Sequence, residues 1–503
     1  MRLINKELLN FDLKKIDLLE CFAFLYLYLP IMIFALTWLK VIFSLIFVLC
    51  VGTSFIFIFS KRTVEPIKMT NRLWVWIIIV SICALFWGYI SGIDGHFCQA
   101  WDWQKHNVIL DDLITHRWPV RYNFGEESGV LCYYIGYYIL PAIFGKIFGF
   151  DVATTTMLLL SVAGIVITSL LIYKNFNNKK PARLLLIFFM ILTASTFFFF
   201  CKCLYNLGHA NDAPNFFNLK IISKSVQIQF RCAILNIRWL CPQYIPVLIA
   251  VALIYEFRYD YSAWAFILMP LSLYNTFAFI CLGGVLAMTW SIDLIQCRTK
   301  VEMIKNTFRI EFVSAIICML LIILYIATNA IQAKPKEARM ALEFINWNNH
   351  FALFVLFHAS WMLWFVILGK KRVFSNNMLI SAGVLLFLLP FFKMGRFNDL
   401  CTKGSAPALI IINFEICRYL IGAIRYRHWA VVRMLVILIL ISSLPNFHEF
   451  RKPLTKYSKN WNKRAYWFPK NREKYLVSET YLKYQYITWS PNRLADILLK
   501  KEK

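Results

Sequence analysis

Residues 41–60 read VIFSLIFVLCVGTSFIFIFS, an apolar run with no charged side chain. A helix of about 20 such residues matches the thickness of the hydrocarbon core of a bilayer. The run therefore predicts a membrane-spanning helix.

Runs of similar character recur along the chain and predict about thirteen spans. They are residues 18–38, 41–60, 73–91, 152–173, 184–200, 240–257, 262–275, 276–295, 311–330, 351–368, 376–392, 407–421 and 429–444. The composition agrees, because 60% of the 503 residues are hydrophobic and 16% are charged, whereas soluble domains have about 45–50% and about 25%. We therefore expect an all-α polytopic membrane protein rather than a disordered chain, a collagen or a disulfide-stapled secreted domain.

The chain is strongly basic, with 54 Lys and Arg against 27 Asp and Glu, a formal net charge of +27. These charges stand between the apolar runs, which favours anionic membrane lipids over nucleic acid as the partner. Many of the 14 cysteines lie inside apolar runs and no CxxC pair occurs. We therefore predict neither a zinc site nor a disulfide framework.

Lysine and arginine in the short loops predict the orientation, because such loops face the cytoplasm. This rule places residues 1–17 inside as a retained segment, and residues 92–151 outside as the first outer loop. Within that loop, the aromatic-rich stretch 131–149 is expected to form a juxtamembrane helix. The membrane domain then covers residues 18–444. The basic tail, 445–503, remains open: its charge favours the cytoplasm, whereas thirteen spans would place it outside.

The first outer loop concentrates carboxylates, histidines and basic side chains. A helical pattern extends from Trp101 to Leu113, and a proline at 119 ends it. Asp102, Lys105 and His106 are one turn apart and would converge on one face. A carboxylate held ionised beside cations can act as a general base. The alternative is a solvated loop with local ion pairs.

Three later outer stretches carry further candidates. Arg231 and Arg238 approach the next span, and Gln243 at its start is expected to face a cavity rather than lipid. The stretch 331–350 and the stretch 393–406, with Arg396 and Lys403, are basic although they are expected outside. A phosphate or diphosphate head group would explain that charge; ordinary loops with snorkelling lysines would too.

Three segments together resemble the GT-C class of polytopic glycosyltransferases. Residues 102–120, DWQKHNVILDDLITHRWPV, resemble a pattern of that class with an acidic residue, Trp-x-Lys-His-Asn and Trp-Pro-Val. Residues 238–246, RWLCPQYIP, resemble its Trp-x-x-Pro-Gln element, and residues 397–409, FNDLCTKGSAPAL, an Asn-Asp…Arg-x-Ser-x-Pro element. Lys403 and Gly404 stand where an arginine-centred stretch is expected. The motifs cover about a tenth of the chain.

The resemblance implies a polyprenyl-phosphate-type sugar donor, a glycan, lipid or protein acceptor, and an active site on the non-cytoplasmic face. A bacterial inner membrane with a periplasmic or exterior site is the expected location. The implied catalytic residue is Asp102, and Asp94 is the second choice. The implied substrate-binding residues are Lys105, His106, Asn107, Asp111, Arg238, Gln243, Arg396 and Lys403. No cofactor is certain, and a divalent metal remains open.

Other classes of function remain open at the level of sequence. A transporter or flippase of lipid-linked glycans would place charges at mid-span, usually in two matching halves, whereas here they stand in loops and no repeat is evident. A polysaccharide polymerase or ligase would share the basic outer loops. A non-catalytic scaffold would leave the acidic loop a structural role.

Overall fold

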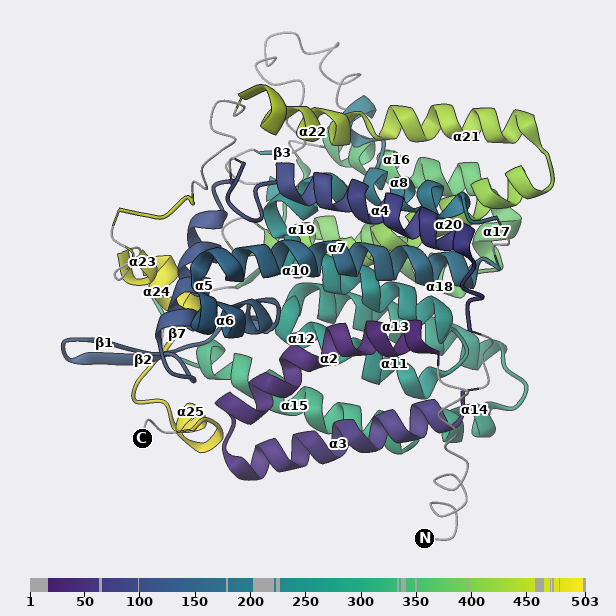
Figure 1. Ribbon diagram of the computed structural model, residues 1–503. Coiled ribbons are helices and arrows are strands. Elements are labelled where there is room, and N and C mark those ends of the chain that lie inside the picture. Colours follow the sequence, from purple (N-terminus) through teal and green to yellow (C-terminus); the bar gives the residue numbers. More distant parts are fainter. Residues whose placement is uncertain are drawn as a thin grey trace.

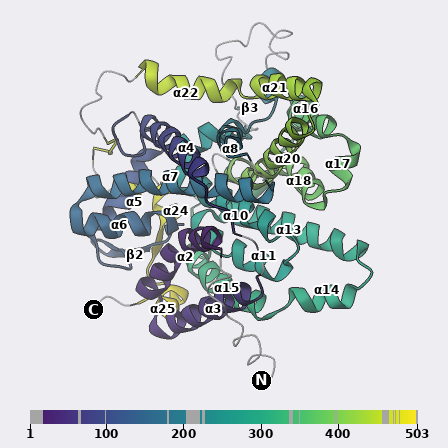
Figure 2. The same cartoon turned by 45° about the vertical axis from the view of Figure 1, so that its right-hand side comes forward.

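The computed structural model shows a bundle of helices with two distinct ends. It describes residues 17–62, 66–97, 99–177, 180–201, 221–222, 227–332, 334–335, 341–348, 351–395, 398–456, 466–470, 472, 475–478 and 480–500. The long helices lie side by side, with the first loop and the C-terminal segment at one end (left in Figure 1) and the short helices α14 and α17 at the other. Figure 2 shows the same division after a rotation of 45°. The predicted N-terminal segment 1–17 lies outside the described residues except for Asp17.

Within the described residues, nine helical segments are long and apolar enough to cross a membrane, and a bent tenth pair also qualifies. The chain is therefore an integral, multi-pass membrane protein. The nine are α2 (Leu18–Trp38), α3 (Val41–Ser60), α4 (Asn71–Ile90), α7 (Phe150–Asn175), α10 (Ala233–Glu256), α13 (Thr276–Gln296), α15 (Ile310–Ala330), α16 (Phe351–Leu368) and the segment of α19 (Asp399–Gly404) with α20 (Ala406–Arg425). The bent pair is α21 (Trp429–Ser442) with α22 (Leu444–Lys456).

The expected number of thirteen spans is not reached by the long helices alone. Three of the expected runs correspond to helices of 10–17 residues, which are shorter than a bilayer requires. These are α8 (Arg183–Thr193), α11 (Tyr261–Leu268) with α12 (Leu271–Tyr274), and α18 (Asn377–Leu388) with the 3₁₀ turn η5 (Leu389–Phe391). Prolines mark two of these interruptions, because Pro270 precedes α12 and Pro390 lies in η5.

Polar residues begin several of the membrane helices. Asp17 accepts a hydrogen bond from the Leu19 amide (2.8 Å) at the start of α2, and Thr70 accepts one from the Leu73 amide (3.2 Å) at the start of α4. Asn275 does the same for α13. Such side chains satisfy amides that have no partner inside the helix.

The core of the bundle is built around α10, which is buried along almost its whole length. By contrast, α3 and α4 present exposed apolar side chains such as Val41, Leu49 and Ile82 on their outer faces. Contiguous exposed apolar surface on such helices is the face expected to contact lipid.

An ion network connects three helices at the end near α14 and α17. Lys174 of α7 contacts Asp17 (2.5 Å), Glu20 of α2 (2.8 Å) and Glu256 of α10 (2.8 Å). Arg62 also pairs with Glu20 and Glu256. Buried carboxylates need such cationic partners, so the network fixes how α2, α7 and α10 pack.

The opposite end carries the short elements. They are α5 (Trp103–Thr115), β1 (Arg121–Phe124), β2 (Glu127–Leu131), α6 (Gly136–Phe148), β3 (Ile221–Ile222), β4 (Gln227–Ile228), β5 (Leu342–Phe344), β6 (Phe392–Met394), α23 (Tyr475–Ser478), α24 (Thr480–Tyr486), β7 (Ile487–Trp489) and α25 (Arg493–Leu498). At the other end, α14 spans Lys300–Thr307 and α17 spans Lys370–Phe374.

The C-terminal tail packs against the first loop. Strands β1, β2 and β7 form one antiparallel sheet in that order, with Val130 opposite Thr488. Asn107 of α5 donates to the carbonyl of Trp467 in the tail (3.1 Å). The tail and residues 92–151 therefore lie at the same end of the bundle. The sequence had left the side of the tail open.

The first loop differs in detail from the expectation. The predicted helix at 101–113 is α5, which begins and ends two residues later. The predicted juxtamembrane helix at 131–149 is shorter, because its first residue belongs to β2 and α6 begins only at Gly136. The three-stranded sheet and the two strand pairs β3–β4 and β5–β6 are small exceptions to the all-α expectation.

Candidate functional site

The site starts at the first turn of α5. Asp102 occupies the N-cap position, but its side chain does not cap the helix. Its Oδ1 lies 3.7 Å from Nζ of Lys105, one turn on. That contact is too long for a hydrogen bond, so the carboxylate is held by charge and keeps its acceptor capacity.

The buried side of α5 joins the first loop to the core. Trp103, Leu110 and Leu113 are fully buried. The Trp103 indole donates to the carbonyl of Arg238 in α10 (2.9 Å). Nδ1 of His106 shares a hydrogen bond with the Tyr138 hydroxyl of α6. Burial, reinforced by the charge of Lys105, lowers the pKa of His106 to about 3; the imidazole is therefore neutral.

Two arginines near the start of α10 approach Asp102 and the tail. Arg231 lies close enough to Asp102 to help lower the pKa of that carboxyl. Arg238 pairs with Glu449 of α22 (3.2 Å), and Glu449 also contacts Lys452. Leu240 has non-helical torsion angles (φ −131°, ψ 28°), which kink α10 just after Arg238.

A lysine from the outer stretch 393–406 completes the group of charges. Nζ of Lys403 in α19 lies 3.1 Å from Asp399 and donates to the Tyr134 hydroxyl (2.9 Å). The rings of Tyr134 and Tyr133 are in contact, with centroids 3.7 Å apart. Gln243, which was expected to face a cavity, donates to the Tyr133 hydroxyl (3.2 Å) and is buried inside the protein.

We call this group the Asp102 cluster. It comprises Asp102, Lys105, Arg231, Arg238, Asp399, Lys403, Glu449 and Lys452. Five cationic side chains face three carboxylates, so the cluster has an excess of two positive charges. Burial would raise the pKa of Asp102, but the surrounding positive charges, that of Lys105 first, lower it below its usual value. The Asp102 carboxylate is therefore ionised, while the cations around it have the charge to hold an anion.

Two of the cations keep unused hydrogen-bond capacity. Among the described residues, neither Nη1 of Arg231 nor Nε of Arg238 has an acceptor, although both atoms are buried. Buried donors of this kind call for a partner such as water or a ligand. Guanidinium groups are well suited to bind phosphate oxygens.

Three other predicted residues of the first loop lie outside the Asp102 cluster. Asp94 is buried and accepts hydrogen bonds from the His96 amide (3.2 Å) and ring (2.8 Å). Asn107 binds Gln99 (2.7 Å) and the tail. Burial raises the pKa of Asp111, while Arg472 of the tail acts in the opposite direction. Arg396, the remaining predicted residue, lies outside the described residues.

Sequence reasoning missed Glu449, which belongs to the cluster, and Tyr134, which accepts a hydrogen bond from Lys403 of the cluster. Glu449 had a signal, because it is the one acidic residue between Glu415 and Glu473 in a basic segment. Tyr134 had none, because it is one of several tyrosines in the stretch 131–149. Arg231 and Asp399 belong to the polar stretches but were not selected as site residues.

The described residues contain no group of three or more His, Cys, Asp or Glu side chains placed to hold a metal ion. The acidic members of the Asp102 cluster are instead each paired with a cation.

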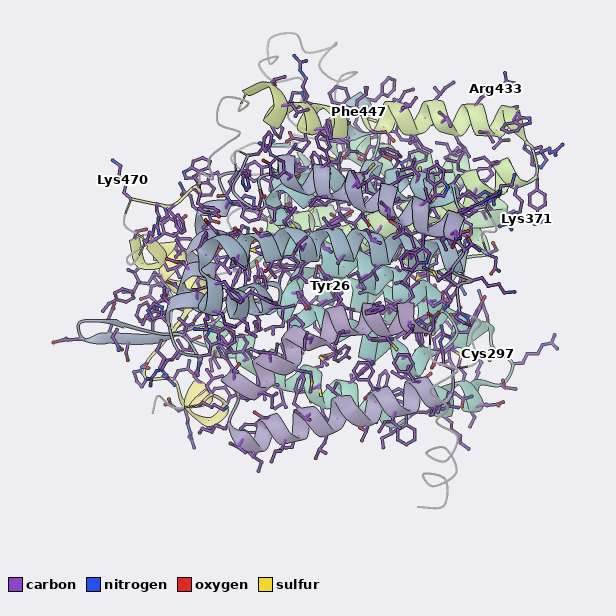
Figure 3. The ribbon with its side chains drawn as sticks, in the orientation of Figure 1. Tyr26, Cys297, Lys371, Arg433, Phe447 and Lys470 are labelled. Carbon is purple, nitrogen blue, oxygen red and sulfur yellow. The ribbon has the colours of Figure 1, made fainter. Side chains whose placement is uncertain are left out.

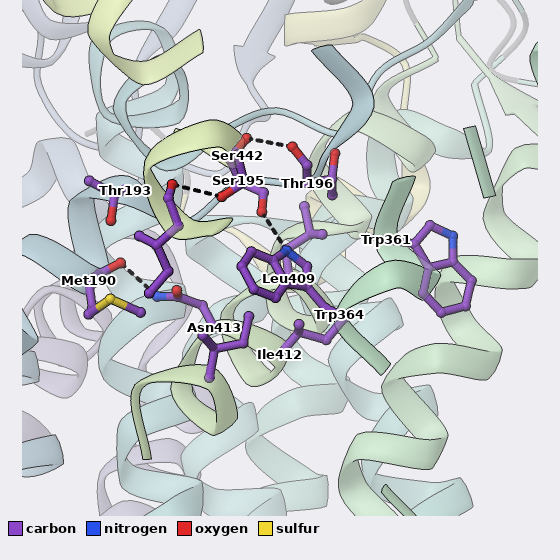
Figure 4. A pocket seen from close by; sticks show the side chains of 12 residues that line it. Met190, Thr193, Ser195, Thr196, Trp361, Trp364, Leu409, Ile412, Asn413 and Ser442 are labelled. Carbon is purple, nitrogen blue, oxygen red and sulfur yellow. Dashed lines mark hydrogen bonds between the residues drawn. The ribbon is translucent and has the colours of Figure 1, made fainter. Parts of the chain in front are cut away.

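A small cavity beside the end of α8 is structural in character (Figure 4). Its volume of about 20 Å³ admits a single water. Asn413 donates to the carbonyl of Met190 (2.8 Å), and Trp364 donates to that of Ser195 (3.1 Å). Asn446 donates to the carbonyl of Thr193 (3.1 Å). These bonds satisfy carbonyls at and just beyond the end of α8.

Comparison with known proteins adds no assignment. No family model, curated protein or solved structure matches the chain.

Proposed function

We propose that the chain is a GT-C-type glycosyltransferase that transfers a sugar from a polyprenyl-phosphate-type donor to a glycan, lipid or protein acceptor. The observation that carries the proposal is the Asp102 cluster, in which one ionised carboxylate lies among cations from three separate parts of the chain, Lys105, Arg231 and Lys403. The expected motif segments at 102–120, 238–246 and 397–409 each contribute to it. A lipid-borne donor also explains why the cluster belongs to a membrane protein.

The residues of the Asp102 cluster and His106 have separate roles in the proposed reaction. Asp102 takes the proton of the acceptor hydroxyl as its oxygen bonds to the anomeric carbon of the sugar. The bond from that carbon to the phosphate oxygen breaks, and the phosphate leaves with the electron pair. Arg231, Arg238 and Lys403 stabilise the negative charge that builds on the phosphate. Neutral His106 and the Lys105 side chain orient the substrates beside the carboxylate.

The arrangement in the membrane follows from the same proposal. The four shorter or bent helical segments complete thirteen passes, with residues 1–17 in the cytoplasm. The Asp102 cluster then faces the periplasm or exterior of a bacterial inner membrane. Support comes from the basic stretches 298–309 and 370–372, which contain α14 and the start of α17 at the opposite end, where Lys371 is labelled in Figure 3.

Replacement of Asp102 tests the catalytic role. In cells that lack the gene, mass spectrometry of the envelope glycans is expected to show one missing sugar, which the wild-type gene restores. Asp102→Asn keeps the side-chain size but removes the base, so restoration should fall by at least about 100-fold. Glu126→Gln is the matched control, because Glu126 is an exposed carboxylate in the same loop.

Expression levels of the two variants are compared by immunoblot of the membranes. Full restoration by Asp102→Asn at normal expression would overturn the proposal. An unchanged set of glycans with an altered distribution of their lipid carriers between the two leaflets would instead identify a transporter or flippase.

A further inference from the structure

A second cationic site lies at the end of the bundle far from Asp102. A cavity of about 390 Å³ opens between the α10–α11 loop, α17 and α20. Arg258, Arg372 and Arg418 line it, together with Glu415 and His428. Figures 1 and 2 show α17 and α20 side by side at the end that is opposite α5 and α6. We call it the basic-end cavity.

Each arginine is held in place mainly by neutral groups. Arg258 donates to the side chain of Asn376 (2.9 Å), and the Arg372 guanidinium lies over the ring of Tyr419 (3.8 Å). Arg418 donates to the side chain of Asn175 (3.0 Å). Amide and aromatic partners orient a guanidinium without cancelling its charge.

The charge of the cavity is therefore mostly unbalanced. Among the described residues, Glu415 is the one carboxylate that lines it, at 3.5 Å from Arg418. It also accepts a hydrogen bond from Tyr255 (2.8 Å). Three guanidinium groups against one carboxylate leave an excess of two positive charges. Planar guanidinium groups that converge on one space match the oxygens of a phosphate group.

The rim of the cavity indicates where such a phosphate comes from. Tyr426 lines the cavity, and Phe374 and Trp429 adjoin lining residues in sequence; the three are 70%, 67% and 57% exposed. Exposed aromatic side chains of this kind are typical of the level of lipid head groups. A phosphate bound between the arginines could therefore keep its acyl chains beside this rim.

We propose that the basic-end cavity binds a phosphate group, carried by an anionic phospholipid of the adjacent leaflet or by a soluble phosphate. The site is separate from the Asp102 cluster and does not depend on the function proposed for it. A lipid held there would connect α10, α17 and α20 at the edge of the bundle.

Lipid retention measured on the purified full-length protein tests this proposal. The protein is exposed to phosphatidylglycerol or phosphatidylcholine in detergent, and bound lipid is counted by native mass spectrometry. Arg258→Gln and Arg372→Gln should each weaken retention of phosphatidylglycerol about tenfold, as expected for one lost charge-assisted contact. Arg433→Gln is the matched control: it removes an exposed charge near the same end (Figure 3) without touching the cavity.

A second arm separates the two sources of phosphate. Inorganic phosphate is added without lipid, and the melting temperature is recorded for the wild type and the same variants. The site is assigned to soluble phosphate if inorganic phosphate raises the melting temperature of the wild type but not of the two cavity variants, and if the wild type does not retain phosphatidylglycerol selectively. The proposal is overturned if neither probe distinguishes the cavity variants from Arg433→Gln, provided that all variants elute as folded protein in gel filtration.

Discussion

Single residues in the first loop have very different electrostatic environments. Asp102 is surrounded by cations and keeps a low pKa. Asp112, ten residues further on, accepts a hydrogen bond from Tyr122 (2.6 Å), yet burial raises its pKa from 3.8 to about 6. Two carboxylates of one short helix region thus titrate differently: the pKa of Asp102 is lowered, whereas that of Asp112 is raised to about 6.

The raised pKa of Asp112 predicts a pH dependence of stability. The folded state binds the proton more tightly than the unfolded state, so this group's contribution to stability falls as the pH rises from about 4 to about 6. Asp112→Asn cannot titrate and keeps an acceptor for Tyr122. We compare the change in melting temperature between about pH 4.5 and about pH 7.5. The wild type should lose about 2 °C more over this range than Asp112→Asn does.

Melting curves in detergent at the two pH values measure this difference. Glu126→Gln serves as the control, because its exposed carboxyl should leave the wild-type pH dependence intact. An identical pH dependence in Asp112→Asn and the wild type would contradict the assignment.

Elements far apart in the sequence meet at the end that contains the Asp102 cluster. Gly129 in β2 illustrates how closely: a Cβ atom there would lie 2.5 Å from a methyl group of Ile487 and 3.0 Å from the Thr488 carbonyl of β7. Only a glycine allows β7 to pair at this position.

Gly129→Val is therefore expected to separate β7 from β2 at a cost of about 1–3 kcal/mol. Limited proteolysis should then cleave the C-terminal segment near Lys483 faster than in the wild type. Ser128→Val changes the neighbouring exposed position of the same strand and should leave the cleavage rate unchanged. Equal protection of Gly129→Val would mean that the strand pairing tolerates a side chain.

The sequence predicts the individual long helices of this protein better than the contacts between segments that are far apart in the chain. Apolar runs such as 41–60 define helices because a bilayer demands length and apolarity, both of which are visible in one segment. The β2–β7 pairing was missed because a three-residue strand at 487–489 has no local signal and depends on a distant partner. Shorter helices such as α8 look like spans in sequence because periodicity does not reveal where a helix breaks.

The same reasoning explains which site residues could be found. Asp102 and Lys105 were recognisable because their spacing on one helix already brings them together. The pairing of Arg238 with Glu449 could not be predicted, because it depends on how the tail folds back over α10.

For the whole molecule, the position of the first loop and the short basic loops at opposite ends has a testable consequence. The Asp102 cluster and the tail lie at one end, and the loops around α14 and α17 lie at the other (Figures 1 and 3). If the basic loops face the cytoplasm, then Glu126→Cys should react with a membrane-impermeant maleimide in intact cells. Lys371→Cys, on the exposed helix α17, should react only after the membrane is opened.

The wild-type protein, with its native cysteines, gives the background for both labelling reactions. Labelling of Lys371→Cys but not Glu126→Cys in intact cells would reverse the orientation. The Asp102 cluster would then face the cytoplasm, away from the expected acceptors.

The pairing of β2 with β7 also constrains how the molecule is made. Glu127 at the start of β2 and Lys483 beside β7 form an ion pair across 356 residues. At roughly 5–20 residues per second, synthesis of the residues between Glu127 and Lys483 takes about 20–70 s. One edge of β2 stays unpaired during that time. An unpaired strand edge can pair with strands of other chains. We therefore expect the nascent protein to benefit from a chaperone that covers the β1–β2 hairpin until β7 has been synthesised.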